Sequence, residues 1–250
     1  MSWSNDNTRP ARFGYRPGMS VRAQAEIDVG LRRHMLGVYN FMMLGLVLSG
    51  ITAYAVANTA LGALFLAGPG KFTALGWVAV FAPLGLILVA SFAAHRLSPA
   101  AIQGLYWAIT AAQGVSLGAL LQVYTGQSVA RTFFVTAAAF GALSLYGYTT
   151  KRNLSGVGSF LLMGLVGILI ASLVNLFLAS NALQFAIMVI GVLVFAGLTA
   201  YDTQRIKEEY VEGMDQGSAT TLQVFGALSL YLNFINLFQL LLSFMGSREE

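Results

Sequence analysis

The chain of 250 residues is too apolar for a water-soluble protein, because hydrophobic residues make up 57% of it and charged residues only 10%, against about 25% charged in an ordinary globular domain. The mean hydropathy of +0.71 supports the same conclusion, and disordered chains are excluded because they are poor in apolar residues. The absence of cysteine excludes disulfides, thiolate nucleophiles and cysteine-ligated metals. The formal charge of +4 is typical of basic loops that face anionic lipid, so we expect a protein of the lipid bilayer and not a nucleic-acid-binding protein.

The first 33 residues form a basic segment with six arginines and no long apolar run. A signal peptide would place its apolar core within about the first 30 residues, whereas here the apolar sequence begins near Met35. We therefore interpret residues 1–33 as a retained cytoplasmic tail. Within it, residues 21–33 fit either a short amphipathic helix on the membrane surface or a disordered basic tail.

Apolar stretches long enough to cross the hydrocarbon core follow one another from Met35 onward. Backbone groups in lipid must be hydrogen-bonded within their own segment, so these stretches are predicted to be helices. Their uninterrupted apolar character excludes the alternating strands of a β-barrel. The sequence predicts an all-α integral membrane protein, with seven transmembrane helices over residues 34–246 and a short C-terminal tail over 247–250. The predicted spans are 35–57, 74–94, 99–121, 129–150, 156–178, 182–204 and 220–245.

The distribution of lysine and arginine predicts a cytoplasmic N-terminus. With that orientation eleven of the 14 basic residues face the cytoplasm, and only Lys71, Arg131 and Arg248 face the opposite side. For the C-terminus two positions, one on each side of the membrane, remain open. The uncharged run from Gln216 to Ser247 is long enough for one tilted crossing, whereas a re-entrant hairpin there would return the tail to the cytoplasm.

Few residues are suited to catalysis. The two histidines, His34 and His95, lie at predicted ends of membrane segments. The stretch from Gly114 to Gly118 matches the G-x-S-x-G pattern of hydrolases, but a nucleophile elbow needs a strand–turn–helix and a nearby base. Ser116 instead lies within an apolar segment. The same residues match G-x-x-x-G, which lets two helices approach closely. We therefore expect a packing motif and no enzyme activity.

Polar residues inside the predicted spans are the best candidates for function, because burying them in lipid is costly. Asp202 is the one convincing ionisable residue, near the cytoplasmic end of the sixth span. The alternative is an interfacial aspartate that is solvated or paired with Arg205 or Arg96. In the seventh span Asn233, Asn236 and Gln239 recur every three residues. This spacing puts them along one helix face, which either lines a pathway or binds neighbouring helices.

Three motifs resemble the Bax inhibitor-1 family, in its bacterial YccA-like branch. They are YDTQRIK at Tyr201–Lys207, FGALSLYGYTTKR at Phe140–Arg152 and LYLNFINLF at Leu230–Phe238. The resemblance extends from about Arg32 to Gly246. It implies a seven-helix bundle in which the other six helices surround the last one. It also implies a pH-sensitive calcium leak, in a bacterial inner membrane.

In the channel-like members of this family two aspartates, on helices six and seven, face each other and share a proton. The first corresponds to Asp202, but the second corresponds to position 233, where this chain has Asn233. A basic residue that can pair with the first aspartate corresponds to Arg96. Two adjacent carboxylates act as a proton switch because they cannot both ionise cheaply. Asn233 instead can donate a hydrogen bond to Asp202, and it removes one oxygen charge that a Ca²⁺ ion would use.

Two functions therefore remain. The first is an ion-conducting protein with no bound cofactor, in which Ca²⁺ is the transported ion and Asp202 is a ligand for it. Asn236 and Gln239 are then candidates for lining the pathway. The second, also implied by the resemblance, is an interaction protein that modulates a membrane-bound AAA protease or other membrane proteins.

Overall fold

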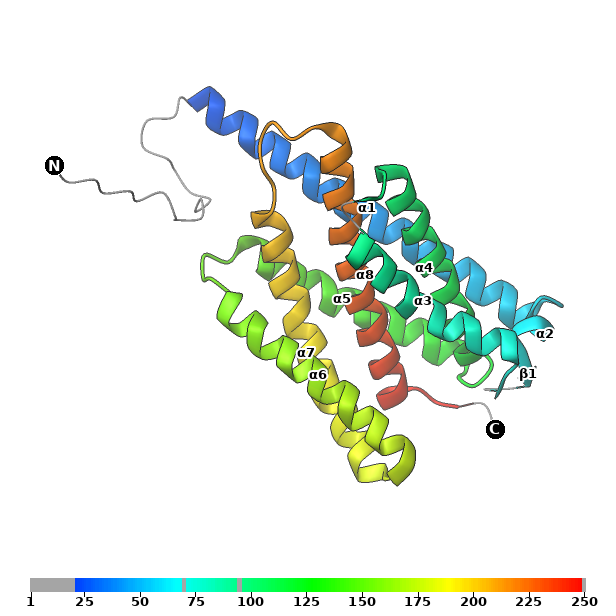
Figure 1. Cartoon of the computed structure of the whole chain (residues 1–250). Coiled ribbons are helices and arrows are strands. Elements are labelled where there is room, and N and C mark those ends of the chain that lie inside the picture. Colours follow the sequence, from blue (N-terminus) through cyan, green and yellow to red (C-terminus); the bar gives the residue numbers. More distant parts are fainter. Residues whose placement is uncertain (1–20, 69–70, 94–95, 249–250) are drawn as a thin grey trace.

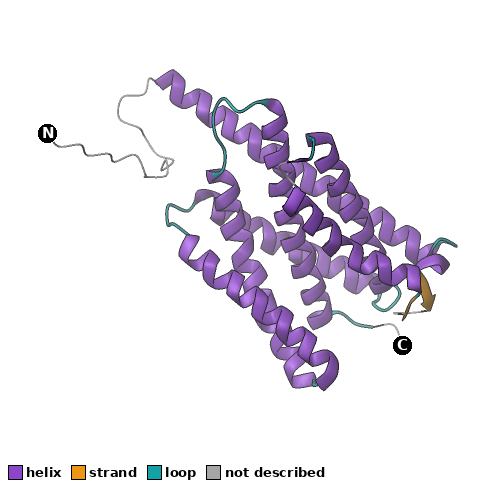
Figure 2. Ribbon diagram, in the orientation of Figure 1, coloured by secondary structure: helices purple, strands orange, loops and turns teal. Residues whose placement is uncertain are grey.

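The computed structural model describes residues 21–68, 71–93 and 96–248, so residues 1–20 of the basic segment, His95 and the last two residues of the tail lie outside the described residues. Long helices packed side by side make up most of this part of the chain (Figure 1), with one small β-hairpin at an end of the bundle (Figure 2). The elements are α1 (Val21–Asn58), α2 (Gly62–Phe65), β1 (Leu66–Gly68), β2 (Lys71–Phe72), α3 (Ala74–Ala93), α4 (Pro99–Leu121), α5 (Gly126–Thr149), α6 (Ser155–Leu178), α7 (Asn181–Glu208) and α8 (Gln216–Met245).

The predicted all-α membrane bundle is confirmed. Six of the described helices are long and apolar enough to cross a membrane, namely α4 to α8 and the part of α1 over Asp28–Asn58. Helix α3 contains a shorter apolar stretch, Ala74–Ala90. Within the described residues each predicted segment falls on a long helix, namely α1 or one of α3 to α8. The first predicted break also contains α2 and the two-strand hairpin, in which Leu66 pairs with Phe72.

Helix α1 begins earlier than predicted, at Val21, and runs without interruption into the first apolar stretch. Its 38 residues span about 57 Å at the α-helical rise, well beyond the thickness of the hydrocarbon core. Between Val21 and Met35 there is no proline and only one glycine, Gly30, so nothing interrupts the helical hydrogen bonding. Residues 21–33 are therefore helical, but as part of α1 and not as a separate surface helix.

The last helix runs through the middle of the bundle (Figure 1) and packs against α1, α4, α5 and α7. A larger share of α8 is buried than of any other candidate span in the described chain. The side chains of Leu230, Tyr231 and Leu237 are almost completely enclosed. Helices α3 and α6 lie farther out, since α3 packs mainly against α4 and α6 mainly against α7.

Helix α8 is one continuous helix of 30 residues, so its two ends lie at opposite ends of the bundle. The re-entrant hairpin considered above does not form. After α8 the chain is bound to the turn between α4 and α5: the Thr125 amide donates to the Ser247 carbonyl over 3.1 Å, and the Ser247 amide donates to Ser128 Oγ over 2.9 Å. The C-terminal segment therefore lies at the same end as the α4–α5 turn.

Helices α1 and α4 approach closely at the G-x-x-x-G motif. A Cβ atom on Gly114 would lie 2.7 Å from the Ser49 carbonyl oxygen, and one on Gly118 would lie 2.8 Å from the Val56 side chain. Neither distance leaves room for a side chain. The motif is thus explained by helix packing, as the packing interpretation predicts.

Side-chain caps begin the helices at several of the predicted breaks. Ser98 accepts a hydrogen bond from the Ala101 amide ahead of Pro99, which is the first residue of α4. Asp215 accepts one from the Ser218 amide at the start of α8. The hydrogen bonds from Ser218 hold the pKa of the Asp215 carboxyl below its ordinary value. These caps satisfy amide groups that have no partner in the first helical turn.

Candidate functional site

Asp202 is a buried carboxylate in the second half of α7, and only 9% of it is exposed. Its helix packs against α5, α6 and α8, so side chains on almost every side of residues 198–206 are enclosed. An ionised group in such a place is costly unless it is paired and hydrogen-bonded. The partners of Asp202 therefore determine what this site can do.

Both carboxylate oxygens of Asp202 have a hydrogen-bond donor. Asn233, on α8, donates from Nδ2 to Oδ2 over 2.7 Å, and only 5% of this asparagine is exposed. Arg205 places Nη2 2.9 Å from Oδ1. It follows Asp202 by three residues, so the two side chains leave the same face of α7. The negative charge is thus neutralised within α7, while α8 supplies an uncharged donor.

The guanidinium of Arg205 connects this cluster to a second acidic group. Its Nη2 also donates to Ser229 Oγ on α8 over 3.1 Å, and its Nη1 lies 3.8 Å from Oε1 of Glu209. The Glu209 side chain is 42% exposed, compared with 12% for that of Asp202. Arg205 therefore has a buried and a more exposed carboxylate within reach, one on each side.

Arg96 is not part of this cluster. It is an exposed residue in the turn before α4, and no ion pair joins it to Asp202 among the residues that the structure describes. Of the two basic partners considered from the sequence, the structure brings Arg205 to Asp202. The short spacing along one helix makes this contact independent of how α3 and α4 are placed.

A chain of hydrogen-bonded hydroxyl groups ends at Thr203, the residue that follows Asp202 in the sequence. Thr203 donates to the Thr199 carbonyl over 2.8 Å, so in its 3.0 Å contact with Ser144 the serine is the donor. Ser144 then accepts from Tyr39 over 2.6 Å. These bonds connect α1, α5 and α7. Sequence reasoning missed them, although the motif that contains Ser144 had been identified for its resemblance.

A second set of hydrogen-bonded hydroxyl groups, at Ser49 and Tyr231, is also buried and was not predicted. Ser49 donates to the Thr110 carbonyl over 2.7 Å, and its oxygen lies 2.6 Å from the Tyr231 hydroxyl. Tyr231 is thus the donor in that contact. This bond connects α1 to the central helix. No pattern in the sequence distinguishes these residues from other serines and tyrosines of apolar helices.

Gln204, next to the cluster, holds the turn between α5 and α6. Its Nε2 donates to the Arg152 carbonyl and its Oε1 accepts from the Leu154 amide, both over 2.8 Å. Lys207 donates to the Tyr148 carbonyl, also over 2.8 Å. The polar residues of the YDTQRIK motif therefore bind α7 to α5, to α8 and to the turn before α6.

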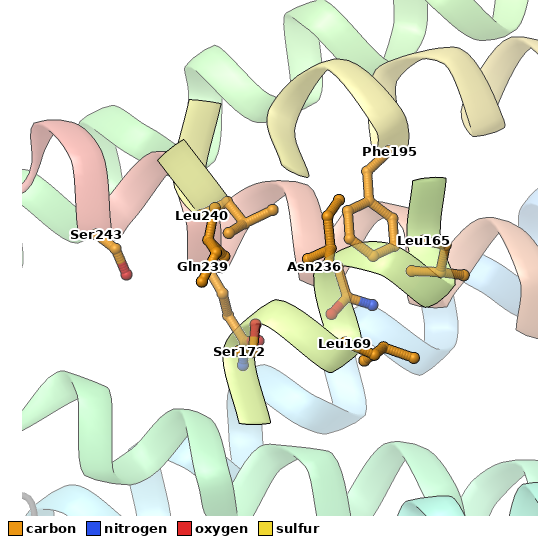
Figure 3. Close-up of a pocket in the computed structure, with 10 residues that line it drawn as sticks. Leu165, Leu169, Ser172, Phe195, Asn236, Gln239, Leu240 and Ser243 are labelled. Atoms are coloured by element: carbon orange, nitrogen blue, oxygen red, sulfur yellow. The ribbon is translucent and has the colours of Figure 1, made fainter. Parts of the chain in front are cut away.

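Asn236 and Gln239 lie away from Asp202, toward the C-terminal end of α8. Unlike Asn233 they are only half-buried, and they face a cavity of about 190 Å³ between α6, α7 and α8 (Figure 3). Asn236 donates to the Leu232 carbonyl of its own helix over 2.8 Å. The predicted polar face is thus divided, with Asn233 in the core and the other two residues in a lateral crevice.

The donor set at Asp202 is sparse for a divalent cation. A Ca²⁺ ion takes six to eight oxygen ligands, most often including several carboxylates. Within the described ranges no group of three His, Cys, Asp or Glu residues is placed to hold a metal ion. Arg205 also lies against Oδ1, where a cation would bind. A cation could bind Asp202 only after Arg205 moves away.

Comparison with known proteins agrees with the motifs. A family profile described as "Inhibitor of apoptosis-promoting Bax1" matches residues 31–250. The inner membrane protein YbhL of Escherichia coli K12 is 44% identical over 222 residues, which cover 88% of this chain and 94% of YbhL. A protein of Caulobacter vibrioides is 54% identical over 235 residues, covering 92% of this chain and 94% of its own. This multi-pass membrane protein therefore belongs to the Bax inhibitor-1 family.

Proposed function

We propose that the protein crosses the bacterial inner membrane seven times, with its N-terminus in the cytoplasm. Within the described part of the chain six helices are long and apolar enough to cross by themselves, and α3 adds the remaining crossing. Its apolar stretch, Ala74–Ala90, is about 25 Å long at the α-helical rise, close to the hydrocarbon thickness, and it packs along α4. The relationship to an inner membrane protein supports the location, and the excess of basic residues on one side supports the orientation.

The same proposal gives the protein a transport role and no enzymatic one: it conducts a cation, with Ca²⁺ as the expected ion, and Asp202 controls the passage. The single observation that carries this is a carboxylate buried between two membrane helices, with a donor on each oxygen. A buried ionisable group within a membrane span is costly to keep for packing alone. Its position between α7 and α8 allows a change in its charge to alter how these helices pack.

In this proposal Arg205 keeps Asp202 closed to cations until its guanidinium moves away. While it pairs with Asp202 and binds Ser229, it holds α7 to α8 and fills the cation position. Glu209 offers an alternative partner 3.8 Å away. A shift of Arg205 toward Glu209 would free Oδ1 for a passing cation. Conduction through Asp202 thus requires the guanidinium to exchange one carboxylate for the other.

Asn233 is expected to weaken the dependence on pH. A second carboxylate at this position would share a proton with Asp202 and titrate with it. The amide instead donates to Oδ2 and has no charge to lose. We therefore expect a leak that varies less with pH than in members of the family that have two aspartates.

The test is calcium entry into dye-loaded liposomes that contain the purified protein, measured from about pH 5 to about pH 8. The parent should conduct with a shallow pH profile. Asp202→Asn should reduce the flux at least about tenfold, the equivalent of 1.4 kcal/mol, and Arg205→Gln should increase it. Asp215→Asn, outside the cluster, is the matched control and should conduct like the parent. An Asp202→Asn variant that conducts normally would refute the assignment of the site.

A second candidate is an interaction protein that modulates a membrane-bound AAA protease or another membrane protein. The observation that favours it is that Asp202 is already neutralised inside the bundle, as expected of a structural ion pair. In that case liposomes should show no flux at any pH. The protein should then co-purify with the protease from native membranes, and Asp202→Asn should lower its thermal stability without a transport phenotype.

A further inference from the structure

The crevice between α6, α7 and α8 is separate from the Asp202 cluster. Along α8 it starts one turn beyond Asn233, at Asn236, and extends to Ser243 close to the helix end. It is open on one side, where Leu169 of α6 is 61% exposed. It forms because α6 packs against α7 and not tightly against α8. Its opening therefore faces the bilayer.

The outward face of α6 is almost entirely apolar. Its large side chains are half or more exposed at several consecutive turns, at Phe160, Met163, Val166, Ile170 and Leu173. Such a surface, on a helix long enough to cross the membrane, is solvated by acyl chains. Lipid is therefore the solvent at the mouth of the crevice.

The crevice nevertheless contains polar groups. Its lining consists of six apolar residues and four polar ones, Ser172, Asn236, Gln239 and Ser243, and Figure 3 shows Gln239 extending from α8 toward the turn of α6 that contains Ser172. Among the described residues no hydrogen bond is found for the side chains of Gln239 and Ser172, and their polar atoms are accessible from the crevice. An amide left without a partner in hydrocarbon costs several kcal/mol. The crevice thus requires an occupant that is apolar along most of its length and carries a hydrogen-bonding group.

We propose that the crevice is a specific binding site for one membrane phospholipid. One acyl chain lies along Leu165, Ile168 and Phe195, and the carbonyl oxygen of its ester linkage accepts a hydrogen bond from Gln239 Nε2. Ser243 lies one turn farther along α8, toward the membrane surface, where the glycerol and headgroup belong. The ligand thereby binds α6 to α8, two helices that contact each other little in the bundle.

The size of the crevice fits a segment of one acyl chain. Its volume of about 190 Å³ is below the roughly 300 Å³ at which pockets for drug-sized molecules begin, so the rest of the phospholipid lies outside the crevice, in the bilayer. A helix from a second copy of the chain is about 10 Å wide with its side chains, and is too bulky to enter. Water would leave the apolar side chains, which form most of the lining, unfavourably hydrated.

The first test is native mass spectrometry of the full-length protein, released from bilayers of phosphatidylethanolamine and phosphatidylglycerol. The parent should retain one phospholipid per chain. Ser172→Trp fills the crevice and should reduce the lipid-bound fraction at least about tenfold. Leu173→Trp, one residue along α6 and 59% exposed, is the matched control and should retain the lipid. The milder Gln239→Leu should reduce retention by about two- to tenfold, the value of one hydrogen bond.

The second test uses the absence of cysteine from the chain, which makes a single introduced thiol specific. Ser172→Cys should react only slowly with N-ethylmaleimide and with a charged methanethiosulfonate, because the lipid that fills the crevice excludes water and a thiol in hydrocarbon hardly ionises to the reactive thiolate. Rapid reaction with the charged reagent would overturn the proposal and favour an aqueous pathway lined by Asn236 and Gln239. A parent that is dimeric, and that Ser172→Trp converts to a monomer, would overturn it in favour of a second copy of the chain. Equal lipid retention by Ser172→Trp and Leu173→Trp would also refute it.

Discussion

Asn233 on α8 and Asp202 on α7 face each other inside the bundle, and the amide Nδ2 donates to the carboxylate Oδ2 over 2.7 Å. A carboxylate at position 233 would repel Asp202 unless one of the two carried a proton. The amide attracts it at any pH. Arg205 pairs with the other carboxylate oxygen, so both oxygens of Asp202 have a donor. The bond from Asn233 therefore holds α7 to α8 without leaving an unpaired charge.

Gln204 should contribute to stability through the turn before α6. Gln204→Ala removes the bonds to the Arg152 carbonyl and the Leu154 amide, and the lost partners should cost about 1–3 kcal/mol. The measurement is thermal unfolding in detergent. Gln127→Ala, at an exposed glutamine of α5, is the control. Equal melting temperatures for the two variants would show that water replaces the side chain at this turn.

Gly114→Ala should be destabilising because its Cβ would lie 2.7 Å from the Ser49 carbonyl oxygen, and backbone can yield only by separating α1 from α4. Such overpacking costs about 1–3 kcal/mol. Gly104→Ala, also on α4, meets no atom within 4 Å and should be neutral or slightly stabilising. The two variants can be compared by thermal unfolding. A Gly114→Ala variant as stable as Gly104→Ala would contradict the close approach of the helices.

The stability of the first turn of α8 should decrease at acidic pH, because Asp215 caps this turn. Hydrogen bonds from Ser218 lower the pKa of this carboxyl, so the folded state binds its proton less readily than the unfolded state. The stabilisation is present above the unfolded pKa, about 3.9, and is lost as the pH falls through the lower folded value. The protection of the Ser218 amide from hydrogen exchange, relative to its intrinsic rate at the same pH, should therefore decrease in acid. Asp215→Asn retains a capping oxygen without a charge and should remove this dependence on pH.

The proposed topology predicts the sides of three loops. Reporter fusions after Lys151 and after Lys207 should both be cytoplasmic, and a fusion after Lys71 should be external. The structure adds that the C-terminal segment lies with the α4–α5 turn, so a fusion at the C-terminus should also be external. A cytoplasmic result at Lys71 would contradict seven crossings with a cytoplasmic N-terminus.

The helices could be predicted closely because lipid imposes a simple rule: an apolar segment must satisfy its own backbone. The break between the predicted spans 129–150 and 156–178, for example, coincides with the turn between α5 and α6. The continuity of α1 from Val21 could not be predicted, because residues 21–33 are polar enough to lie in water and fitted a separate surface helix or a disordered tail equally well. The small hairpin between α2 and α3 rests on a few backbone bonds with no sequence pattern of its own.

The site was predictable in part. Asp202 was identified because it is an ionisable residue within a membrane segment, and its contact with Arg205 follows from a spacing of three residues. Its contact with Asn233 required the relative rotation of α7 and α8, which only the resemblance suggested. The bond between Ser49 and Tyr231 joins residues 182 positions apart. Such pairs depend on tertiary packing, and serine and tyrosine are too common in membrane helices to identify one.

The replacement of Asn233 by aspartate is the most direct test of the site, because the two side chains are already in hydrogen-bonding contact. Asn233→Asp should place two carboxylates close together in a poorly hydrated region. Unit charges about 4 Å apart repel by about 4 kcal/mol at an effective dielectric constant near 20. Binding a proton relieves this repulsion, so the charge of the pair becomes sensitive to pH. Calcium flux, or thermal stability, should then vary more steeply with pH than in the parent.

The double variant Asp202→Asn/Asn233→Asp is the matched control, because it exchanges the two groups and leaves a single carboxylate in the cluster. The repulsion is absent, so the added steepness should vanish, although the new carboxylate is still buried. Arg205 already contacts α8 at Ser229, but its 2.9 Å ion pair with the carboxylate at position 202 is lost, so this variant should also be less stable than the parent. If Asn233→Asp alone changed neither flux nor stability from about pH 5 to about pH 8, the carboxylates would not interact. Control of the leak by charge at Asp202 would then be refuted, while the helical bundle and the family assignment would be unaffected.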